Sequence, residues 1–252
     1  MSLQPVKQML DAALKEVRGA PADASARMKL FRLFALTGQW ERAVTQLDTA
    51  SNLDTSLGMT CMVYKQSLAC ELFRSEVFQG KRTPVIAGEP AQWLAWLIEG
   101  LRADSQGQGN ALREQAVEQA PARAGTLDGH PFEWIADADP RLGPVCEAFI
   151  DGKYFWIPFE RISEIRLAAP DDLIDLVWAS CDLTFSSGGT KPALIPVRYP
   201  GTESAADDDL VQARKTIWEG SDESGFRGLG QRCLVTDAAE VGLLDVRSIV
   251  IA

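Results

Sequence analysis

Two carboxylates close together, Asp137 and Asp139, are the most enzyme-like feature of this 252-residue chain. Neighbouring carboxylates can take different pKa values and serve as an acid and a base, or bind a divalent cation. The same Asp-Ala-Asp-Pro segment has the composition of a turn closed by carboxylate-to-backbone hydrogen bonds, with Arg141 near enough to neutralise one charge. We expect the structural turn, and the alternative is a metal-assisted or acid–base hydrolase that uses both aspartates.

Other catalytic patterns are incomplete in the sequence. The only histidine, His130, lies in a Gly-His-Pro turn with no nucleophile elbow. The segment SSGGTKP (186–192) places its lysine before a proline, and GFRGLGQR (225–232) has its glycines in the wrong order for a dinucleotide fingerprint. Both are expected to be loops with glycines at positive φ. Clusters of zinc ligands are also missing, so we expect no catalytic residue, no metal and no cofactor.

Charge and cysteine usage narrow the class of protein and its compartment. The net charge is −10, and the densest charge run, residues 203–209, is acidic and expected to lead into a helix N-terminus, so nucleic acid is not an expected partner. No apolar run reaches the roughly 18 residues of a membrane span, and the first residues do not resemble a secretory signal. The five cysteines are widely spaced without a CxxC pair, as expected for reduced core thiols. We therefore expect a cytoplasmic protein.

Helical periodicity dominates the first half of the chain. Helices are expected over residues 3–18, 27–37, 40–50, 56–78 and 111–119, with another apolar face between 93 and 101. Asp23 or Ser25 can cap the second helix. The 56–78 helix is apolar nearly all round, and we expect it to be buried.

Short segments rich in β-branched and aromatic residues follow Pro121. Asp151-Gly152 predicts a hairpin turn between strands 144–150 and 153–158, with Tyr154 and Trp156 on one face of the second strand. Further strands are expected at 162–167, 173–178, 181–185, 192–197, 215–218, 232–235 and 245–251, with a short helix at 208–213. The predicted fold is α+β, with a helical subdomain over residues 1–122 and a β-rich subdomain over 123–252.

One stretch of the helical half has the spacing of a tetratricopeptide repeat, in which two antiparallel helices meet through large and small residues around a glycine turn. The matching residues are Leu30, Phe34, Gly38, Trp40, Ala43, Leu47 and Ala50. Such repeats stack into arrays whose concave face binds an extended or helical peptide. The inner helices would present five residues to that groove: Met28, Arg32, Met59, Met62 and Gln66. The alternative is that the methionines fill the core.

Several longer segments are similar to those of one known family. They are LTGQWERAVTQLD (36–48), the continuous stretch 132–162 with its DADPRLGP and WIPF motifs, DDLIDLVWA (171–179), IPVRYPG (195–201), TIWEG (216–220) and GLGQRCLVTD (228–237). With these segments the chain resembles, over essentially its whole length, the ImpE or SciE-type family, also called TagJ, an accessory of the bacterial type VI secretion system.

The resemblance implies a cytoplasmic adaptor that binds the N-terminal helix of the small contractile-sheath subunit and is linked to the unfoldase that recycles the sheath. It carries no set of catalytic residues. We therefore expect a non-catalytic adaptor. The alternatives are the hydrolase with Asp137 and Asp139, and a generic repeat chaperone without a role in secretion.

Overall fold

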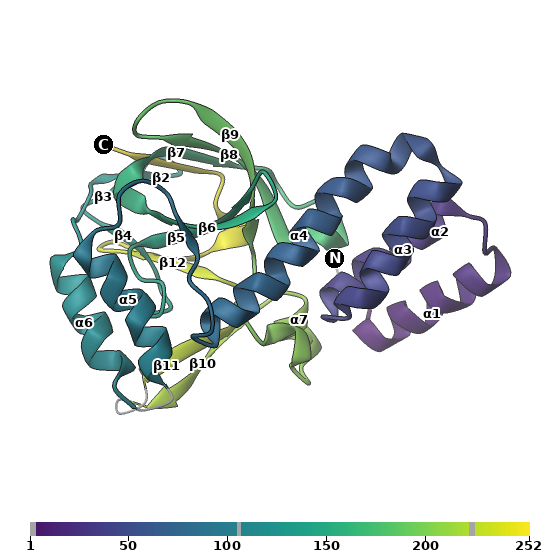
Figure 1. Cartoon of the computed structure of the whole chain (residues 1–252), viewed down its shortest axis with the longest axis horizontal. Helices are drawn as coiled ribbons and strands as arrows, with labels where there is room; N and C mark the ends of the chain where they lie inside the picture. The colour runs from purple at the N-terminus through teal and green to yellow at the C-terminus, as the bar shows by residue number, and fades with distance from the viewer. Residues whose placement is uncertain (1–3, 105–106, 222–224) are drawn as a thin grey trace.

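The computed structural model describes residues 4–104, 107–221 and 225–252. Figure 1 shows a helical lobe, formed by the first three helices and the start of the fourth, beside a β-rich body. The helices are α1 (Val6–Gly19), α2 (Ala24–Leu36), α3 (Trp40–Leu53), α4 (Gly58–Phe78), α5 (Gln92–Ala103), α6 (Gly109–Gln119) and α7 (Asp208–Val211). The α5–α6 hairpin lies against the β-rich body, away from α1–α3 (Figure 1).

The β-rich body contains three sheets. The nine-stranded sheet has the order β1-β6-β5-β9-β8-β7-β14-β2-β3, and smaller sheets pair β13-β12-β4 and β10-β11. The strands are β1 (Val85–Ile86), β2 (Gly125–Leu127), β3 (His130–Phe132), β4 (Ile135–Asp137), β5 (Val145–Ile150), β6 (Lys153–Pro158), β7 (Ile162–Leu167), β8 (Trp178–Phe185), β9 (Thr190–Pro196), β10 (Thr216–Ser221), β11 (Gly225–Gly230), β12 (Cys233–Thr236), β13 (Glu240–Gly242) and β14 (Ser248–Ile251). The α+β fold class predicted from the sequence is confirmed.

The repeat-like segment forms an antiparallel helical hairpin of α2 and α3. The Asp23 carboxylate caps α2 by accepting hydrogen bonds from the backbone N–H groups of Ser25 and Ala26. Gly38 turns the chain with a φ of 66°, which costs glycine little. Large side chains at Leu30, Phe34 and Leu47 and small ones at Ala43 and Ala50 are buried between the helices.

Helix α4 is buried on one side only, so the prediction that it is buried all round is wrong. Its buried residues are Cys61, Ser67, Leu68, Cys70, Glu71, Arg74 and Val77, which include two charged groups. Met59, Met62 and Leu72 are 70%, 45% and 52% exposed. An apolar pattern around a helix therefore does not mark burial when polar residues make the packed face.

The β5–β6 hairpin turns at Asp151-Gly152, as the sequence predicts. Both residues have positive φ, 48° and 72°, as a two-residue turn of this kind requires. Two other segments differ from prediction. Leu173–Leu176 is a 3-10 helix capped by Asp172 and not a strand, and Gly225–Gly230 is strand β11 and not a loop. Gly225 and Gly230, at the two ends of β11, do take positive φ, and the whole segment pairs with β10.

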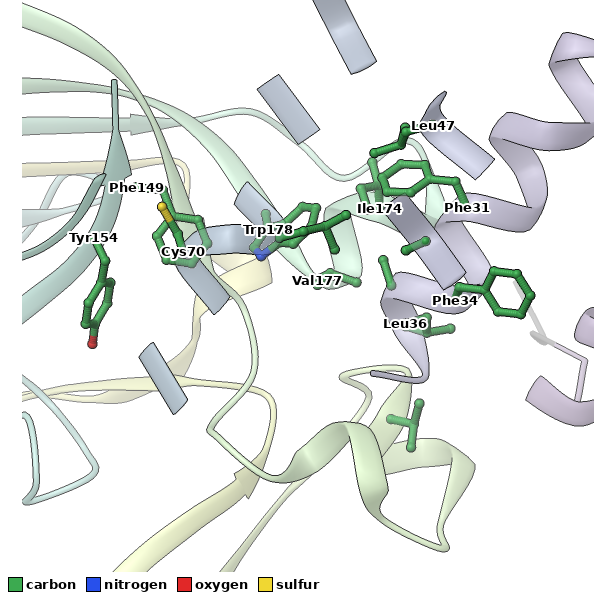
Figure 2. Packing of buried hydrophobic residues seen from close by; sticks show 14 of the residues in the cluster. Phe31, Phe34, Leu36, Leu47, Cys70, Phe149, Tyr154, Ile174, Val177 and Trp178 are labelled. Atoms are coloured by element: carbon green, nitrogen blue, oxygen red, sulfur yellow. The ribbon is translucent and has the colours of Figure 1, made fainter. Parts of the chain in front are cut away.

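Hydrophobic packing joins the two halves of the chain. One buried cluster runs from α1–α3 along α4 to the outer face of the nine-stranded sheet, and Figure 2 follows it from Phe31 and Leu47 through Trp178 to Tyr154. A second cluster fills the space between the inner face of that sheet and the β4–β12 strands. The division at residues 1–122 and 123–252 stays a prediction, and the first cluster crosses it.

Alternation along β6 sends neighbouring side chains to the two clusters. Tyr154 and Trp156 join the first, where they contact the rings of Phe73 and Phe78 of α4, and Phe155 packs on the second. Trp156 is completely buried and so contributes to the core and not to a contact surface.

Candidate partner-binding groove

A buried network of charged groups holds α4 on the sheet. The Glu147 carboxylate of β5 accepts hydrogen bonds from Arg74 of α4, with 2.8 Å between Nε and Oε1 and 3.0 Å between Nη2 and Oε2. It also accepts from the Arg232 guanidinium and the Tyr154 hydroxyl. Glu71, one helical turn before Arg74, accepts from the Trp178 indole N–H at 2.9 Å. Two arginines thus share one carboxylate between a helix and a strand.

The arginines decide the ionisation of Glu147. Burial alone would raise its pKa, but the charges of Arg74 and Arg232 outweigh burial and hold the pKa at about 2. The carboxylate is therefore ionised across the physiological range, and the network is a buried set of ion pairs.

The two aspartates singled out in the sequence form a structural turn beside this network. Asp137 accepts from the backbone N–H of Asp139 at 2.8 Å, from the Tyr199 hydroxyl at 3.0 Å and from Arg232 at 2.7 Å. Asp139 accepts from the backbone and side chain of Arg141 and from the Gly228 N–H at 2.9 Å.

Substrate cannot reach these carboxylates in this conformation. Asp137 and Asp139 are 3% and 0% exposed. Burial raises the pKa of Asp137 to about 7 even though Arg232 opposes the shift, which is a value suited to acid–base chemistry. The cavity beside Asp137 has a volume of only about 10 Å³, which is at the lower limit for one water molecule. The arrangement closes a turn and pairs charges.

An open groove of about 610 Å³ lies between α4 and the outer face of the nine-stranded sheet. Its helical wall consists of Val63, Gln66, Ser67 and Cys70, at the spacing of one helix face. Its floor comes from β5, β7, β8 and β9 and is lined by Phe149, Arg166, Ser180, Asp182, Pro192 and Leu194, among others. We call this surface the α4 groove.

The five residues predicted for a partner groove do not all lie on one surface. Met28 is buried, with its sulfur 3.9 Å from that of Cys61, so it fills the core as the alternative interpretation had it. Arg32 forms an ion pair with Asp172, with 2.6 Å between Nε and Oδ2. Met59 and Met62 are exposed on α4, and Gln66 lies in the α4 groove, where its side chain covers the turn at Gly152.

Sequence reasoning missed the sheet side of the α4 groove. Its floor comes from three consecutive strands, β7, β8 and β9, and from β5, which lies beside β9 only in the sheet, while its helical wall is more than 70 positions before the first of these strands. On β8 and β9 the alternation of Ser180 with Cys181 and of Leu194 with Ile195 signals one face toward the groove and one toward the core. That signal marks an exposed face and does not identify the helix beside it.

The remaining candidate residues of the sequence are structural or lie on the surface. His130 begins strand β3 and is exposed. All five cysteines are buried, as predicted, and none forms a disulfide. Within residues 4–104, 107–221 and 225–252, no three His, Cys, Asp or Glu side chains come together as metal ligands. No helix in this described part of the chain is long and apolar enough to span a bilayer.

These features define a class of protein: a repeat-type helical hairpin followed by a helix, α4, that buried ion pairs fix to a β-rich body, with an open groove beside α4. A crystal structure of protein VPA1032 from Vibrio parahaemolyticus shares this fold, with a TM-score of 0.89 and 21% identity over 98% of this chain and 94% of that one.

Similarity in sequence identifies the family, whereas the structural likeness at 21% identity shows the fold alone. The ImpE protein family matches residues 129–250. The type VI secretion system accessory component TagJ of Pseudomonas aeruginosa is 44% identical over 247 residues, which cover 95% of this chain and 86% of the relative. The chain therefore belongs to the ImpE family of type VI secretion accessory proteins, and the resemblance noted in the sequence is confirmed.

Proposed function

We propose that this chain is a non-catalytic, cytoplasmic adaptor of a type VI secretion system that binds the N-terminal helix of the small contractile-sheath subunit in the α4 groove. In this proposal the chain also links the sheath to the unfoldase that recycles it. The relationship to TagJ supports the secretion role, and one observation carries the choice of site: an open groove of about 610 Å³ lies next to the exposed apolar residues of α4.

The chemistry of the α4 groove suits an amphipathic helix. Val63 of its wall is 41% exposed, Met62 next to it in α4 is 45% exposed, and Phe149 and Leu194 provide apolar floor. A helix that lies in a groove uses apolar anchors at i, i+3, i+4 and i+7, and methionines adapt to such anchors. Arg166 and Asp182 place opposite charges on the floor, where they can select the orientation of the bound helix.

The geometry favours this function over the two alternatives. A hydrolase that uses Asp137 and Asp139 would need access for substrate, and both carboxylates are buried and fully hydrogen-bonded. A generic repeat chaperone would need an array of repeats, whereas the described helices contain one repeat-like hairpin followed by α4.

The test is a calorimetric titration of the chain with a peptide of the sheath small subunit's N-terminal helix. We expect micromolar or tighter binding that is weakened at least tenfold by Met62→Glu and by Val63→Glu, since each places a charge at the apolar contact. The matched control is Leu72→Glu, which makes a similar change on the opposite side of α4, where Leu72 is 52% exposed.

Each outcome bears on a separate part of the proposal. Binding that survives both groove variants would place the site elsewhere while keeping the partner. Absence of binding by the wild-type chain would refute the partner. Equal loss in Leu72→Glu would show that the variants act through the folding of α4, which circular dichroism of each variant checks.

A further inference from the structure

A second, smaller groove lies on the far side of the helical lobe, between α1 and α3. Its volume is about 260 Å³, and α2 forms its floor. Leu14, Leu30 and Phe34 supply the apolar part of the lining, and Arg18, Arg27 and Arg42 supply positive charge. We call it the arginine groove.

None of these three arginines forms an ion pair with any residue the structure describes. Arg27 donates to the Gln46 amide oxygen at 3.0 Å and to the Pro21 carbonyl oxygen at 2.9 Å, both uncharged acceptors. Arg42 lies over the Phe34 ring, 4.0 Å from its centroid, and donates to the Gln39 amide oxygen. Arg18 is exposed at the end of α1.

The arginine groove is unusual within this protein. Elsewhere in the described chain, arginines pair with carboxylates. The exceptions, Arg161, Arg198 and Arg247, donate to backbone carbonyl oxygens. In a chain with a net charge of −10, three arginines without carboxylate partners in one groove are a local site of opposite sign to the whole molecule.

The arginine groove is separate from the α4 groove. On α2, Leu30 and Phe34 are four residues apart and face the arginine groove. Met28 and Arg32 are also four residues apart and face the other way, toward Cys61 of α4 and toward Asp172. The α4 groove is lined by α4 and the nine-stranded sheet and shares no residue with the arginine groove of α1, α2 and α3, so occupation of one leaves the other open.

From this geometry we propose that the arginine groove docks an acidic amphipathic helix of a second protein partner, in addition to the helix assigned to the α4 groove. Its volume is below the roughly 300–1,000 Å³ of small-molecule pockets, so the ligand is a surface segment and not a metabolite. Apolar side chains of the partner contact Leu14, which is only partly buried, whereas Leu30 and Phe34 form the closed base of the groove with exposures of 2% and 1%. Glutamate or aspartate side chains on the same segment pair with Arg18 and Arg42, where guanidinium groups bind carboxylates through paired hydrogen bonds.

Two grooves with separate linings would make the chain bivalent, which is what an adaptor between two assemblies requires. The arginine groove can bind such a helix whatever occupies the α4 groove, because its arginines form no ion pair with any described residue. The net charge of −10 repels an acidic partner from the molecule as a whole, and three arginines together attract it to the groove, so charge also directs binding.

The test uses a fluorescent amphipathic helical peptide of about 16 residues, long enough to be helical, with leucines on one face and glutamates flanking them. A second peptide carries glutamine in place of each glutamate. We expect fluorescence anisotropy to show binding of the acidic peptide at least tenfold tighter than binding of the glutamine peptide, with affinity that falls as salt is added.

Variants assign this binding to the arginine groove. Arg18→Glu/Arg42→Glu should abolish it, and Arg18→Gln/Arg42→Gln should weaken it about tenfold while preserving the fold more closely. The matched control, Lys81→Glu/Lys153→Glu, makes the same change of charge on exposed lysines of the β-rich body and should leave binding within about twofold.

The proposal is overturned by equal binding of the two peptides, by no binding of the acidic peptide, or by binding that survives both arginine variants. Stronger binding of a single-stranded oligonucleotide of matched charge would also overturn it, because the groove would then be selective for phosphate. Sheath-peptide binding that is unchanged in Arg18→Glu/Arg42→Glu would confirm that the two grooves act separately.

Discussion

Replacement of Glu147 by glutamine tests whether the buried network holds α4 on the sheet. The carboxylate is 0% exposed and accepts hydrogen bonds from Arg74, Arg232 and Tyr154. Glutamine has nearly the same shape but no charge, so two buried guanidinium groups lose their shared partner. Loss of one partner of a buried ion pair costs about 3–5 kcal/mol. This is a large share of the roughly 5–15 kcal/mol that stabilises a folded domain.

The assay is urea unfolding followed by tryptophan fluorescence. Trp178 donates to Glu71 and Trp156 to the Tyr154 hydroxyl, so two reporters lie in contact with the network. We expect Glu147→Gln to unfold at lower urea with a free energy of unfolding reduced by about 3–5 kcal/mol. A double-mutant cycle with Arg74→Gln should give a coupling energy of about 1–3 kcal/mol, because the two side chains contact each other directly.

A matched control separates burial from charge. Glu16→Gln removes the same charge from a surface pair with Lys29, in which both side chains are about half exposed, and should change the free energy by at most about 1 kcal/mol. A loss no larger than this in Glu147→Gln would refute the reasoning, since the buried pairs would then contribute no more than exposed ones.

Three further outcomes follow from the same structure. Between pH 4.5 and about 2 the difference in unfolding free energy between wild type and Glu147→Gln should narrow by roughly 3 kcal/mol. The Glu147 carboxylate stabilises the fold fully above its unfolded pKa of 4.5, and this stabilisation is lost as pH falls through its folded pKa of about 2. Urea unfolding at several pH values measures the difference, and a constant difference would contradict the prediction. Gly228→Ala should destabilise the fold by about 1–3 kcal/mol, because a Cβ there would lie 2.3 Å from atoms of the buried Tyr199 ring. The control Gly19→Ala has open space around its Cβ and should leave the melting temperature unchanged. Burial raises the pKa of the Cys146 thiol to about 12, so native protein at pH 8 should react with a disulfide reagent far more slowly than urea-unfolded protein, and equal rates would contradict the burial of the thiols.

Local features of the fold could be predicted because they depend on few neighbouring residues. Gly38, Asp23 and the Asp151-Gly152 turn act through backbone dihedrals and short-range hydrogen bonds, so the sequence identifies them directly. One wrong prediction of secondary structure also has a local cause. Leu173–Leu176 has an apolar pattern typical of a strand, yet the hydrogen bonds of Asp172 and Asp175 with nearby backbone N–H groups make it a helical turn.

The candidate site could be predicted only in part. The exposed methionines of α4 were found from their spacing, but Met28, at the same kind of spacing on α2, is in the core. Helical periodicity groups residues on a face and does not say whether another element covers that face. Here the side of α2 that carries Met28 is covered by η4, the 3-10 helix over Leu173–Leu176, and by α4. The first of these is distant from α2 in the chain, and the second is separated from α2 by α3.

The family, the α+β class and the turn formed by Asp137 and Asp139 were determined by the sequence itself, because motifs, periodicity and turn chemistry are local properties of the chain. The two grooves and the Arg74–Glu147–Arg232 network were decided by tertiary structure alone. Their residues come from elements up to 158 positions apart, as between Arg74 and Arg232. Only the packing of α4 on the sheet makes a buried carboxylate between two arginines favourable, since each charge is stable there only in the presence of the others.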